Sequence, residues 1–383
     1  MNYTTIGILG GGQLGRMLTL EAKRMGYRVI TLEPLPNSPC GQVADEQIVA
    51  AYDDFRAVGE LGARSDVVTY EFENIPREAV EALETDRRLV RPDGRVLRTT
   101  QDRILEKTFL RENGIPTADF TAVTSEEHLT LAEAAIGYPA VLKTTTGGYD
   151  GKGQWVARAP EQARAALDAA RGQPLIFERM IPFDRELAII AARNAAGEIV
   201  TFPVTENVHD HGVLSTTIVP ARVPESDARR VREIATAIGR ALEIIGAYAV
   251  EFFWSENELL VNEIAPRVHN SGHYSLDATQ ISQHEAHIRA ICDLPLVQPH
   301  MWVPAAVMVN ILGSGTGDRL DGVDVVLRET DLKLHLYGKA HAALRRKMGH
   351  FTVLSTDVAA ALAVAERARA QLRWSDRRAG IAV

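Results

Sequence analysis

The chain has 383 residues, of which 46% are hydrophobic and 24% are charged, and its formal net charge is −8 at pH 7. This length exceeds the size at which one hydrophobic core stops growing, so two or three domains are expected. The composition is that of an ordinary globular protein. Because a nucleic-acid scaffold normally carries a basic face, the acidic balance argues against nucleic acid as a partner.

The cysteines and the N-terminus indicate the compartment. Cys40 and Cys292 lie far apart and outside any C-x-x-C pattern, which is typical of unpaired thiols in a reducing environment. The N-terminal residues lack the charged region and long apolar stretch of a secretory signal. No apolar run approaches the roughly 18 residues needed to span a bilayer. We therefore expect a cytoplasmic protein without membrane contact.

Residues 1–98 alternate strand and helix signals. The strand-like segments are TIGIL, YRVITLEP and SDVVTYEFENIP, and helical spacing follows the first and third of them. Strands separated by helices predict a parallel sheet with right-handed crossovers. The expected unit is a Rossmann-like N-terminal domain.

The first strand leads into a glycine-rich turn, IGILGGGQLGR, whose Gly10, Gly12 and Gly15 fit G-x-G-x-x-G. This context is typical of a dinucleotide-binding turn, and Glu33 even lies where a ribose-binding acid would fall. The alternative is a tight strand-to-helix turn without a dinucleotide. We favour the alternative because the motifs described below already supply a nucleotide site.

The remainder of the chain predicts three further units. Residues 99–115 have the pattern of one linker helix, ended by Asn113-Gly114 and followed by Pro116. Residues 116–183 predict a small α+β module, enough for a lid. Residues 184–383 change to hairpins around a long amphipathic helix, with a small subdomain from about residue 300. The expected fold class is therefore α/β followed by α+β.

The segment KTTTGGYDGKGQ, residues 143–154, has four glycines and two lysines between two strand-like segments. Glycines let backbone N–H groups approach an anion closely, and lysines neutralise phosphate charge. A mobile, solvated hairpin loop is the alternative interpretation. The segment lacks the G-K-[ST] of a Walker A loop, and a strand rather than a helix follows it.

Two acids, Glu251 and Glu263, lie on apolar strands, where an unpaired carboxylate is costly. A three-residue turn would pair Trp254 with Glu258 and Ala249 with Glu263, which places Glu251 diagonally adjacent to Glu263 on the same face. Two carboxylates on one face suit Mg²⁺, which combines one or two of them with phosphate oxygens. Two half-exposed strand acids are the alternative.

Two further segments concentrate polar residues. NEIAPRVHNSGHYS, residues 262–275, follows a buried strand and is expected to form either a site or a satisfied hydrogen-bond network. HLYGKAHAALRRKMGH, residues 335–350, carries Lys339 and Arg346 among other cations. These cations would suit a phosphate monoester, although a charge run alone more often marks a solvated face.

These motifs, in this order, resemble the N5-carboxyaminoimidazole ribonucleotide synthetase family of the ATP-grasp superfamily. The resemblance rests on GILGGGQLGRM, TYEFENIP, KTTTGGYDGKGQ, VEFFW…LLVNEIAPRVHNSGH and RKMGH, and spans nearly the whole chain. The family usually ends close to RPGRKMGH, whereas this chain has ALRRKMGH, which keeps Arg346 but lacks an arginine and the Pro-Gly pair.

The resemblance implies a three-domain ATP-grasp fold, ATP and Mg²⁺ as cofactors, aminoimidazole ribonucleotide and bicarbonate as substrates, and a homodimer. It assigns Glu251 and Glu263 to the metal and Asp150, Lys152, Arg267 and His273 to catalysis. The positions it assigns to ATP are Arg103, Lys143, Gly148, Tyr149, Asp150, Gly151, Lys152, Gly153, Gln154, Glu178, Arg179, Met180, Ile181, Glu186, His209, Asn262 and Glu263. Those assigned to the ribonucleotide are Glu73, Tyr149, Asp150, Lys152, Arg267, Lys339 and Arg346.

The implied reaction belongs to de novo purine synthesis. Bicarbonate attacks the γ-phosphate of ATP to give carboxyphosphate, and the exocyclic amine captures the carboxyl group from carboxyphosphate or from released CO₂. Asp150 is the residue expected to orient that amine or take its proton. The alternatives are a formate-dependent glycinamide ribonucleotide transformylase, a non-catalytic nucleotide sensor and a nicotinamide-dependent oxidoreductase. The intact acids Glu251 and Glu263 disfavour the sensor.

Overall fold

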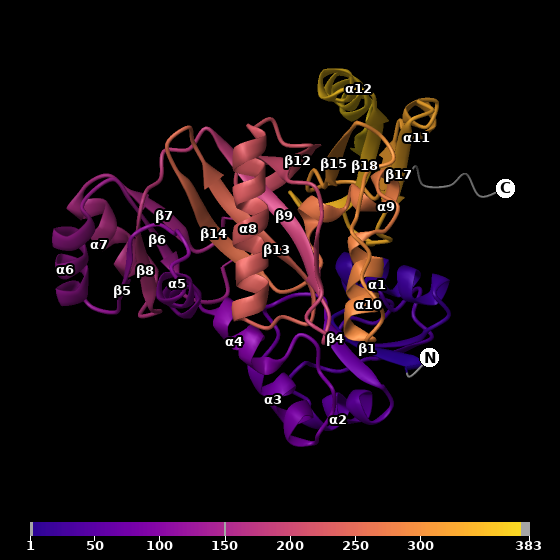
Figure 1. Ribbon diagram of the computed structural model, residues 1–383, viewed down its shortest axis with the longest axis horizontal. Helices are drawn as coiled ribbons and strands as arrows, with labels where there is room; N and C mark the ends of the chain where they lie inside the picture. Colours follow the sequence, from indigo (N-terminus) through magenta and orange to yellow (C-terminus); the bar gives the residue numbers. More distant parts are fainter. Residues whose placement is uncertain (1–2, 149–150, 377–383) are drawn as a thin grey trace.

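The computed structural model describes residues 3–148 and 151–376. Figure 1 shows the indigo N-terminal strands and helices at the bottom and the purple residues of the expected lid at the left. The large sheet begins beside the lid and continues into the orange and yellow C-terminal strands. No helix in the described ranges is long and apolar enough to cross a bilayer.

The N-terminal elements form the parallel sheet that the sequence predicts, with strand order β3-β2-β1-β4. The short strand β3 and the helix before β4 were not predicted from the sequence. The elements are β1 (Thr5–Leu9), α1 (Gln13–Arg24), β2 (Arg28–Leu32), β3 (Glu46–Ile48), α2 (Phe55–Ala63), β4 (Val67–Tyr70) and α3 (Arg77–Thr85).

The linker is two helices, α4 (Gly94–Gln101) and α5 (Arg103–Glu112), so the prediction of a single helix over residues 99–115 was wrong. The break is at Asp102, whose backbone is extended and whose carboxylate accepts the N–H groups of Ile104 and Leu105. An aspartate that caps free N–H groups starts a new helix. This new helix turns Arg103 and the residues after it toward the large sheet.

The lid is a four-stranded antiparallel sheet in the described residues, with strand order β5-β8-β6-β7 and two helices. It has its own hydrophobic core, which includes Leu142, Phe177 and Ala163. The elements are β5 (Phe120–Val123), α6 (Glu126–Ile136), β6 (Ala140–Thr144), β7 (Gln154–Ala157), α7 (Pro160–Ala169) and β8 (Leu175–Arg179).

The large sheet has nine strands in the described residues, eight of them in the order β14-β13-β9-β11-β12-β15-β18-β17, with β10 paired to β9. One face of β9 and β13 packs on α8 and the other on α10 (Figure 1). The first elements of this part are β9 (Arg185–Arg193), β10 (Ile199–Thr201), β11 (Thr205–Asp210), β12 (Val213–Val219), α8 (Glu225–Ala241), β13 (Gly246–Trp254), β14 (Leu259–Ala265), η1 (Asn270–Gly272), α9 (Ser275–Ala278) and α10 (Gln283–Ile291).

The C-terminal elements extend this same sheet, because β15 pairs with β12 on one side and β18 on the other. Helix α12 covers β15 and β18 through an apolar core that includes Phe351 and Ala365. The elements are β15 (Ala305–Leu312), β16 (Arg319–Asp321), α11 (Val323–Val326), β17 (Leu332–Leu336), β18 (Lys347–Ser355), α12 (Val358–Gln371) and β19 (Arg373–Ser375).

Candidate active site

Glu251 of β13 and Glu263 of β14 lie directly opposite each other, so the predicted shared face is confirmed. The predicted pairing was wrong: Trp254 pairs with Leu259, and Ala249 pairs with Ala265. The hairpin turn runs from Ser255 to Glu258 and is one residue longer than expected.

A β-bulge explains why the two acids share a face although the predicted pairing was wrong. Glu251 pairs with Glu263 but Phe252 pairs with Val261, so Asn262 is an extra residue in the ladder. Side chains alternate between faces along a strand, and one extra residue reverses that alternation. Val261 therefore faces the α8 core, whereas Glu263 lies on the other face beside Glu251.

Each carboxylate has a nitrogen donor beside it. Nη1 of Arg103 lies 3.2 Å from Oε2 of Glu263, and Nε2 of His269 lies 3.5 Å from Oε1 of Glu251. Burial and the charge of Arg267 hold the pKa of His269 well below its usual range, so only Arg103 is a cation at neutral pH. Burial and the facing Glu263 raise the pKa of the Glu251 carboxyl to about 8. A bound cation would relieve this repulsion, so the pair fits a divalent metal whose other ligands are phosphate oxygens. In the described parts of the chain, no cluster of three or more metal-ligating side chains occurs.

The lid carries a buried ion pair next to this site. Nζ of Lys143, on β6, lies 2.5 Å from Oε2 of Glu178, on β8. Burial alone would raise the pKa of Glu178, but Lys143 and Lys107 outweigh it and hold the pKa at about 2. Glu178 is therefore an anion at neutral pH.

The glycine loop joins β6 to β7 through backbone that favours glycine. Gly151 and Gly153 have φ angles of 76° and 69°. A Cβ atom at Gly153 would lie 2.7 Å from Oγ1 of Thr144, so a side chain there would also clash. Tyr149 and Asp150, which we expect in this loop, lie outside the described residues.

The remaining loop positions lie between the lid strands and the linker. A Cβ atom at Gly148 would be 3.8 Å from Nη2 of Arg103, so this end of the loop approaches the carboxylate pair through Arg103. Lys152 is exposed, and Gln154 begins β7 opposite Lys143.

Residues 178–181, at the end of β8, form the segment that we call the hinge, and its residues make different kinds of contact. Arg179 donates to Oε1 of Glu258 at 2.8 Å, which ties the lid to the β13–β14 turn. The N–H of Met180 donates to the carbonyl of Pro139 at 3.1 Å, and the side chain of Ile181 is buried. Each of these groups thus has a structural contact in the present conformation.

His209 of β11 and Glu186 of β9 form an ion pair through Nδ1 and Oε2. Burial lowers the pKa of His209, but the hydrogen bond and charge of Glu186 outweigh this and raise it. Asn262 presents a buried Oδ1 that has no hydrogen-bond partner among the described residues. An orphaned acceptor beside two carboxylates is a free contact for a ligand.

Arg267 and Glu73 pair across two domains. Arg267 donates to both carboxylate oxygens of Glu73, through Nε and, at 2.8 Å, through Nη2. Neighbouring carboxylates keep the pKa of Arg267 high in spite of burial. The pair joins the segment after β14 to the loop after β4, so two of the expected ribonucleotide residues meet here.

The segment 335–350 lies against the N-terminal domain. Nε2 of Gln42 donates to the carbonyl of Gly338 at 2.9 Å. Lys339 donates to the carbonyl of Lys347 at 2.8 Å, and Arg346 contacts the carbonyl of His341 at 3.2 Å. Lys339 directly follows Gly338 and is therefore near the domain that carries Glu73, whereas Arg346 contacts its own segment.

The glycine turn after β1 is filled by an acid that the sequence analysis missed. Glu71 accepts the N–H groups of Gly12 and Gly15, while Glu33 accepts the N–H of Gly11 at 2.9 Å. Burial raises the pKa of Glu71, and the two N–H groups oppose that shift. The donors that a dinucleotide pyrophosphate would use are thus already satisfied. Glu71 could have been found as the acid that directly follows β4.

His273 was expected to be catalytic, but it is only 1% exposed. Its ring packs against His284 and His350, with centroid distances of 5.9 and 4.9 Å. Burial and the neighbouring histidines hold its pKa well below the usual range. The histidine that reaches the carboxylate pair is His269, which the sequence analysis noted but did not assign.

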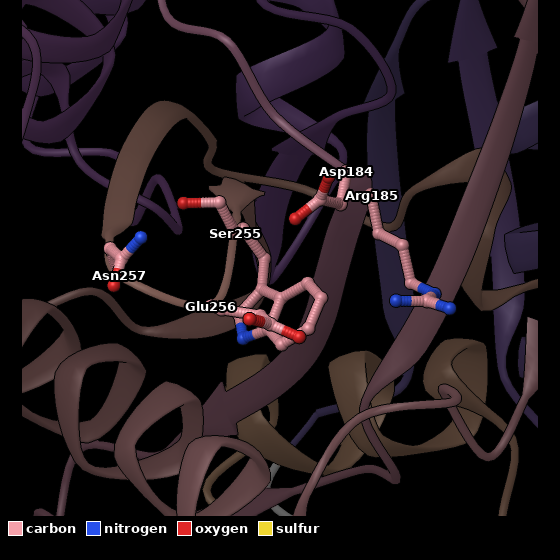
Figure 2. A pocket seen from close by; sticks show the side chains of 6 residues that line it. Asp184, Arg185, Ser255, Glu256 and Asn257 are labelled. Carbon is pink, nitrogen blue, oxygen red and sulfur yellow. The ribbon is translucent and has the colours of Figure 1, made fainter.

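A cavity of about 430 Å³ lies at the turn between β13 and β14 rather than at the carboxylates. Figure 2 shows Asp184 and Arg185 on one side of it and Ser255, Glu256 and Asn257 on the other. Trp254, which also lines it, belongs to the core beneath α8. The cavity is therefore on the α8 face of the sheet, opposite Glu251 and Glu263.

Three family models match the chain in succession. They are the ribonucleotide synthetase preATP-grasp domain at residues 3–101, the ATP-grasp domain at residues 108–284 and the phosphoribosylaminoimidazole carboxylase C-terminal domain at residues 306–364. Together they cover the N-terminal sheet, the lid with most of the large sheet, and the C-terminal elements.

Curated relatives and solved structures agree with these models. The N5-carboxyaminoimidazole ribonucleotide synthase of Brucella melitensis is 46% identical over 91% of this chain and 96% of the relative, and that of Bacillus subtilis is 43% identical over 91% of each. An ADP complex of N5-carboxyaminoimidazole ribonucleotide synthetase superposes with a TM-score of 0.89 at 45% identity, covering 95% of this chain and 96% of that one. The Aspergillus clavatus synthase in complex with ADP and 5-aminoimidazole ribonucleotide gives a TM-score of 0.89 at 31% identity, covering 96% and 98%.

Proposed function

We propose a residue-level mechanism from the premise that this chain belongs to the N5-carboxyaminoimidazole ribonucleotide synthase family of ATP-grasp enzymes. The protein is an ATP-dependent carbon–nitrogen ligase of purine biosynthesis that makes N5-carboxyaminoimidazole ribonucleotide from 5-aminoimidazole ribonucleotide. The observation that carries the mechanism is the facing pair Glu251 and Glu263 beside Arg103, next to the Arg267–Glu73 pair.

Nucleotide binding begins at the lid. Lys143 and Arg103 neutralise the phosphates, and residues 148–154 close over them. The hinge segment 178–181 meets adenine, and Glu186 with His209 holds the ribose. Asn262, with its free Oδ1, completes this site.

In this proposal Glu251 and Glu263 would hold Mg²⁺, which would supply positive charge next to the transferring phosphoryl group. The support is the facing arrangement of the two acids and the raised pKa of Glu251, which burial and Glu263 cause.

Bicarbonate attacks the γ-phosphate, its C–O oxygen forms the new P–O bond, and ADP leaves, giving carboxyphosphate. Arg267, fixed by Glu73, stabilises the bicarbonate and carboxyphosphate anions. Asp150 and Lys152 orient the exocyclic amine, which forms a C–N bond to the carboxyl carbon of carboxyphosphate, or of CO₂ released from it, while inorganic phosphate leaves and Asp150 takes the amine proton. We propose that His273 acts as a positioning residue rather than a catalytic one, because its ring is buried among other histidines.

The ribonucleotide binds between the N-terminal domain and segment 335–350. Lys339 and Arg346 contact its phosphate, and Tyr149 with Glu73 lies beside its base and ribose. The support is the Gln42–Gly338 contact, which brings that segment to the N-terminal domain. We also propose a cytoplasmic homodimer with no nucleic-acid or membrane partner, on the basis of the family resemblance and the net charge of −8.

The direct test measures ADP release with ATP, bicarbonate and 5-aminoimidazole ribonucleotide, each omitted in turn. Full turnover should need all three. Stimulation by formate with glycinamide ribonucleotide instead of bicarbonate would favour the transformylase, and NADH binding by fluorescence would favour an oxidoreductase.

Asp150→Ala should abolish carboxylation while ATP binding persists, because we propose that its carboxylate acts on the amine, whereas Lys143 and Arg103 bind the phosphates. Calorimetric titration with ADP and a product assay measure the two properties separately. Retained turnover by this variant would remove Asp150 from the mechanism.

A further inference from the structure

Lys107 of α5 is a buried ammonium without a place in the mechanism so far. The residue is only 1% exposed. Its Nζ donates to Oγ1 of Thr117 at 2.7 Å and to the carbonyl of Val261 at 3.2 Å. Burial of an ammonium group costs several kcal/mol unless the group is paired. Burial accordingly lowers the pKa of Lys107, and the charges of Glu178 in the lid and of Glu106 oppose that shift. The contact with Glu178 is the ion pair that Lys107 makes.

Glu178 lies between two lysines. Lys143 is 2.5 Å from its Oε2, and Lys107 is 3.5 Å from its Oε1. Oε1 has no hydrogen-bond partner among the described residues. Both lysines help to keep the pKa of the carboxyl low against the effect of burial. One buried anion is thus shared by two cations at unequal distances.

The two lysines differ in how they are held. Lys143 is on β6 and Glu178 is on β8, so both partners of this ion pair belong to the lid. Lys107 is outside the lid, on the linker helix α5. Its Nζ donates to Thr117, just before the first lid strand, and to Val261 of β14, and these two residues form a β-bridge. The contact between Lys107 and Glu178 therefore crosses from the lid to the body of the enzyme.

The mechanism requires Lys143 to contact phosphates, yet its ammonium is here engaged by Glu178. A carboxylate that is 4% exposed cannot lose its cation without a large electrostatic cost. Lys107 is close enough to take over the pairing with a small movement of Glu178.

We propose that Lys107 is a positioning residue for nucleotide binding, which keeps Glu178 paired when Lys143 turns to the phosphates. This inference rests on the proposed contact between Lys143 and the nucleotide. Lys107 itself touches no substrate, and acts by lowering the cost of releasing Lys143.

The test compares ADP with adenosine as calorimetric titrants of the whole enzyme. Lys107→Met removes charge and hydrogen bonds, and Lys107→Gln removes the charge while keeping donors for Thr117 and Val261. Both variants should bind ADP at least about tenfold more weakly, the scale for a buried charge pair that loses one partner. Adenosine affinity should stay within about twofold, because adenosine has no phosphate to draw Lys143 from Glu178.

Thr117→Val is the matched control, since it removes a hydrogen bond to Lys107 but leaves the ion pair, and it should bind ADP as wild type does. Wild-type ADP affinity in Lys107→Gln, or equal losses for ADP and adenosine, would overturn the proposal. If Lys143→Met leaves ADP affinity unchanged, the assignment of Lys143 itself is wrong.

If the Lys107 variants do not fold, a crystal structure of the wild-type ADP complex decides. Lys143 on a phosphate, with Lys107 within hydrogen-bond distance of Glu178, supports the proposal. Lys143 still paired with Glu178 contradicts it.

Discussion

At the scale of single residues, the site depends on charges that are held by opposite charges. Glu73 illustrates this, because both of its oxygens accept hydrogen bonds from Arg267. The resemblance placed Glu73 against the ribonucleotide, and its contact in the structure is with the arginine that we assign to carboxyphosphate. We therefore expect Glu73 to affect the reaction mainly by fixing the position of Arg267.

Glu73→Ala should lower kcat at least about tenfold and change the KM for ATP less than threefold, since it frees Arg267 to turn away from the reacting carboxyl group. Steady-state kinetics with each substrate varied in turn measure the split. Glu73→Gln, which keeps one acceptor for Arg267, should fall between the wild type and the alanine variant. An equal rise in the KM for ATP would argue for a general loss of structure.

A second residue-scale prediction concerns pH. Burial, with smaller contributions from His287 and His335, lowers the pKa of His284 to about 3, whereas an unfolded histidine titrates near 6.5. Between these values only the unfolded state gains the proton, so the free energy of unfolding falls as the pH falls below 6.5.

His284→Phe should therefore lose less stability than the wild type between pH 7 and pH 5, by on the order of 2 kcal/mol. Urea unfolding at the two pH values measures the difference. Parallel losses in both proteins would show that His284 does not control this pH dependence.

At the scale of elements, the bulge in β14 decides which face of the sheet Glu263, the proposed metal-binding acid, occupies. Asn262 is the extra residue opposite Glu251 and Phe252. If Asn262 took a regular place in the ladder instead, Glu263 would follow the alternation of Val261 into the core beneath α8.

Deletion of Asn262 removes the bulge but brings Glu263 directly after Val261, so the alternation still turns Glu263 toward Glu251. The deletion and Asn262→Ala, which keeps the bulge and removes only the amide, should therefore lose ADP formation alike, by roughly threefold to tenfold for one ligand contact of about 1 kcal/mol. ADP release and circular dichroism of both variants measure the effect. A deletion variant at least about a hundredfold less active than Asn262→Ala, with an unchanged spectrum, would show that the bulge itself positions Glu263.

At the scale of the whole molecule, the proposed ribonucleotide site depends on contacts between segments that are distant in the sequence. Segment 335–350 contacts the N-terminal domain through Gln42 and Gly338, which are 296 positions apart in the sequence. The Arg267–Glu73 pair makes a second link, over 194 positions.

Gln42→Ala should raise the KM for 5-aminoimidazole ribonucleotide roughly threefold to tenfold and leave the KM for ATP unchanged, since one hydrogen bond is worth about 1 kcal/mol. Kinetics with the ribonucleotide varied at saturating ATP measure this change. A change confined to the KM for ATP would place segment 335–350 at the nucleotide instead.

The sequence by itself determined the parallel N-terminal sheet, the small α+β lid and the presence of two acids on the neighbouring strands of one hairpin. These features follow from the alternation and spacing of apolar and polar residues over short stretches of the sequence. The motif resemblance identified the family, which the relatives and solved structures confirm. The assigned site residues stay predictions.

Only the tertiary structure decided the features that depend on contacts between distant residues. The carboxylate of Asp102 divides the linker helix, and Asn262 forms a bulge that no alternation pattern reveals. Glu71 fills the glycine turn because β4 lies beside β1, and His273 is buried because β18 packs against its segment. Such positions are set by packing and by pairing of buried charges across the whole fold. They therefore cannot be derived from local patterns in the sequence.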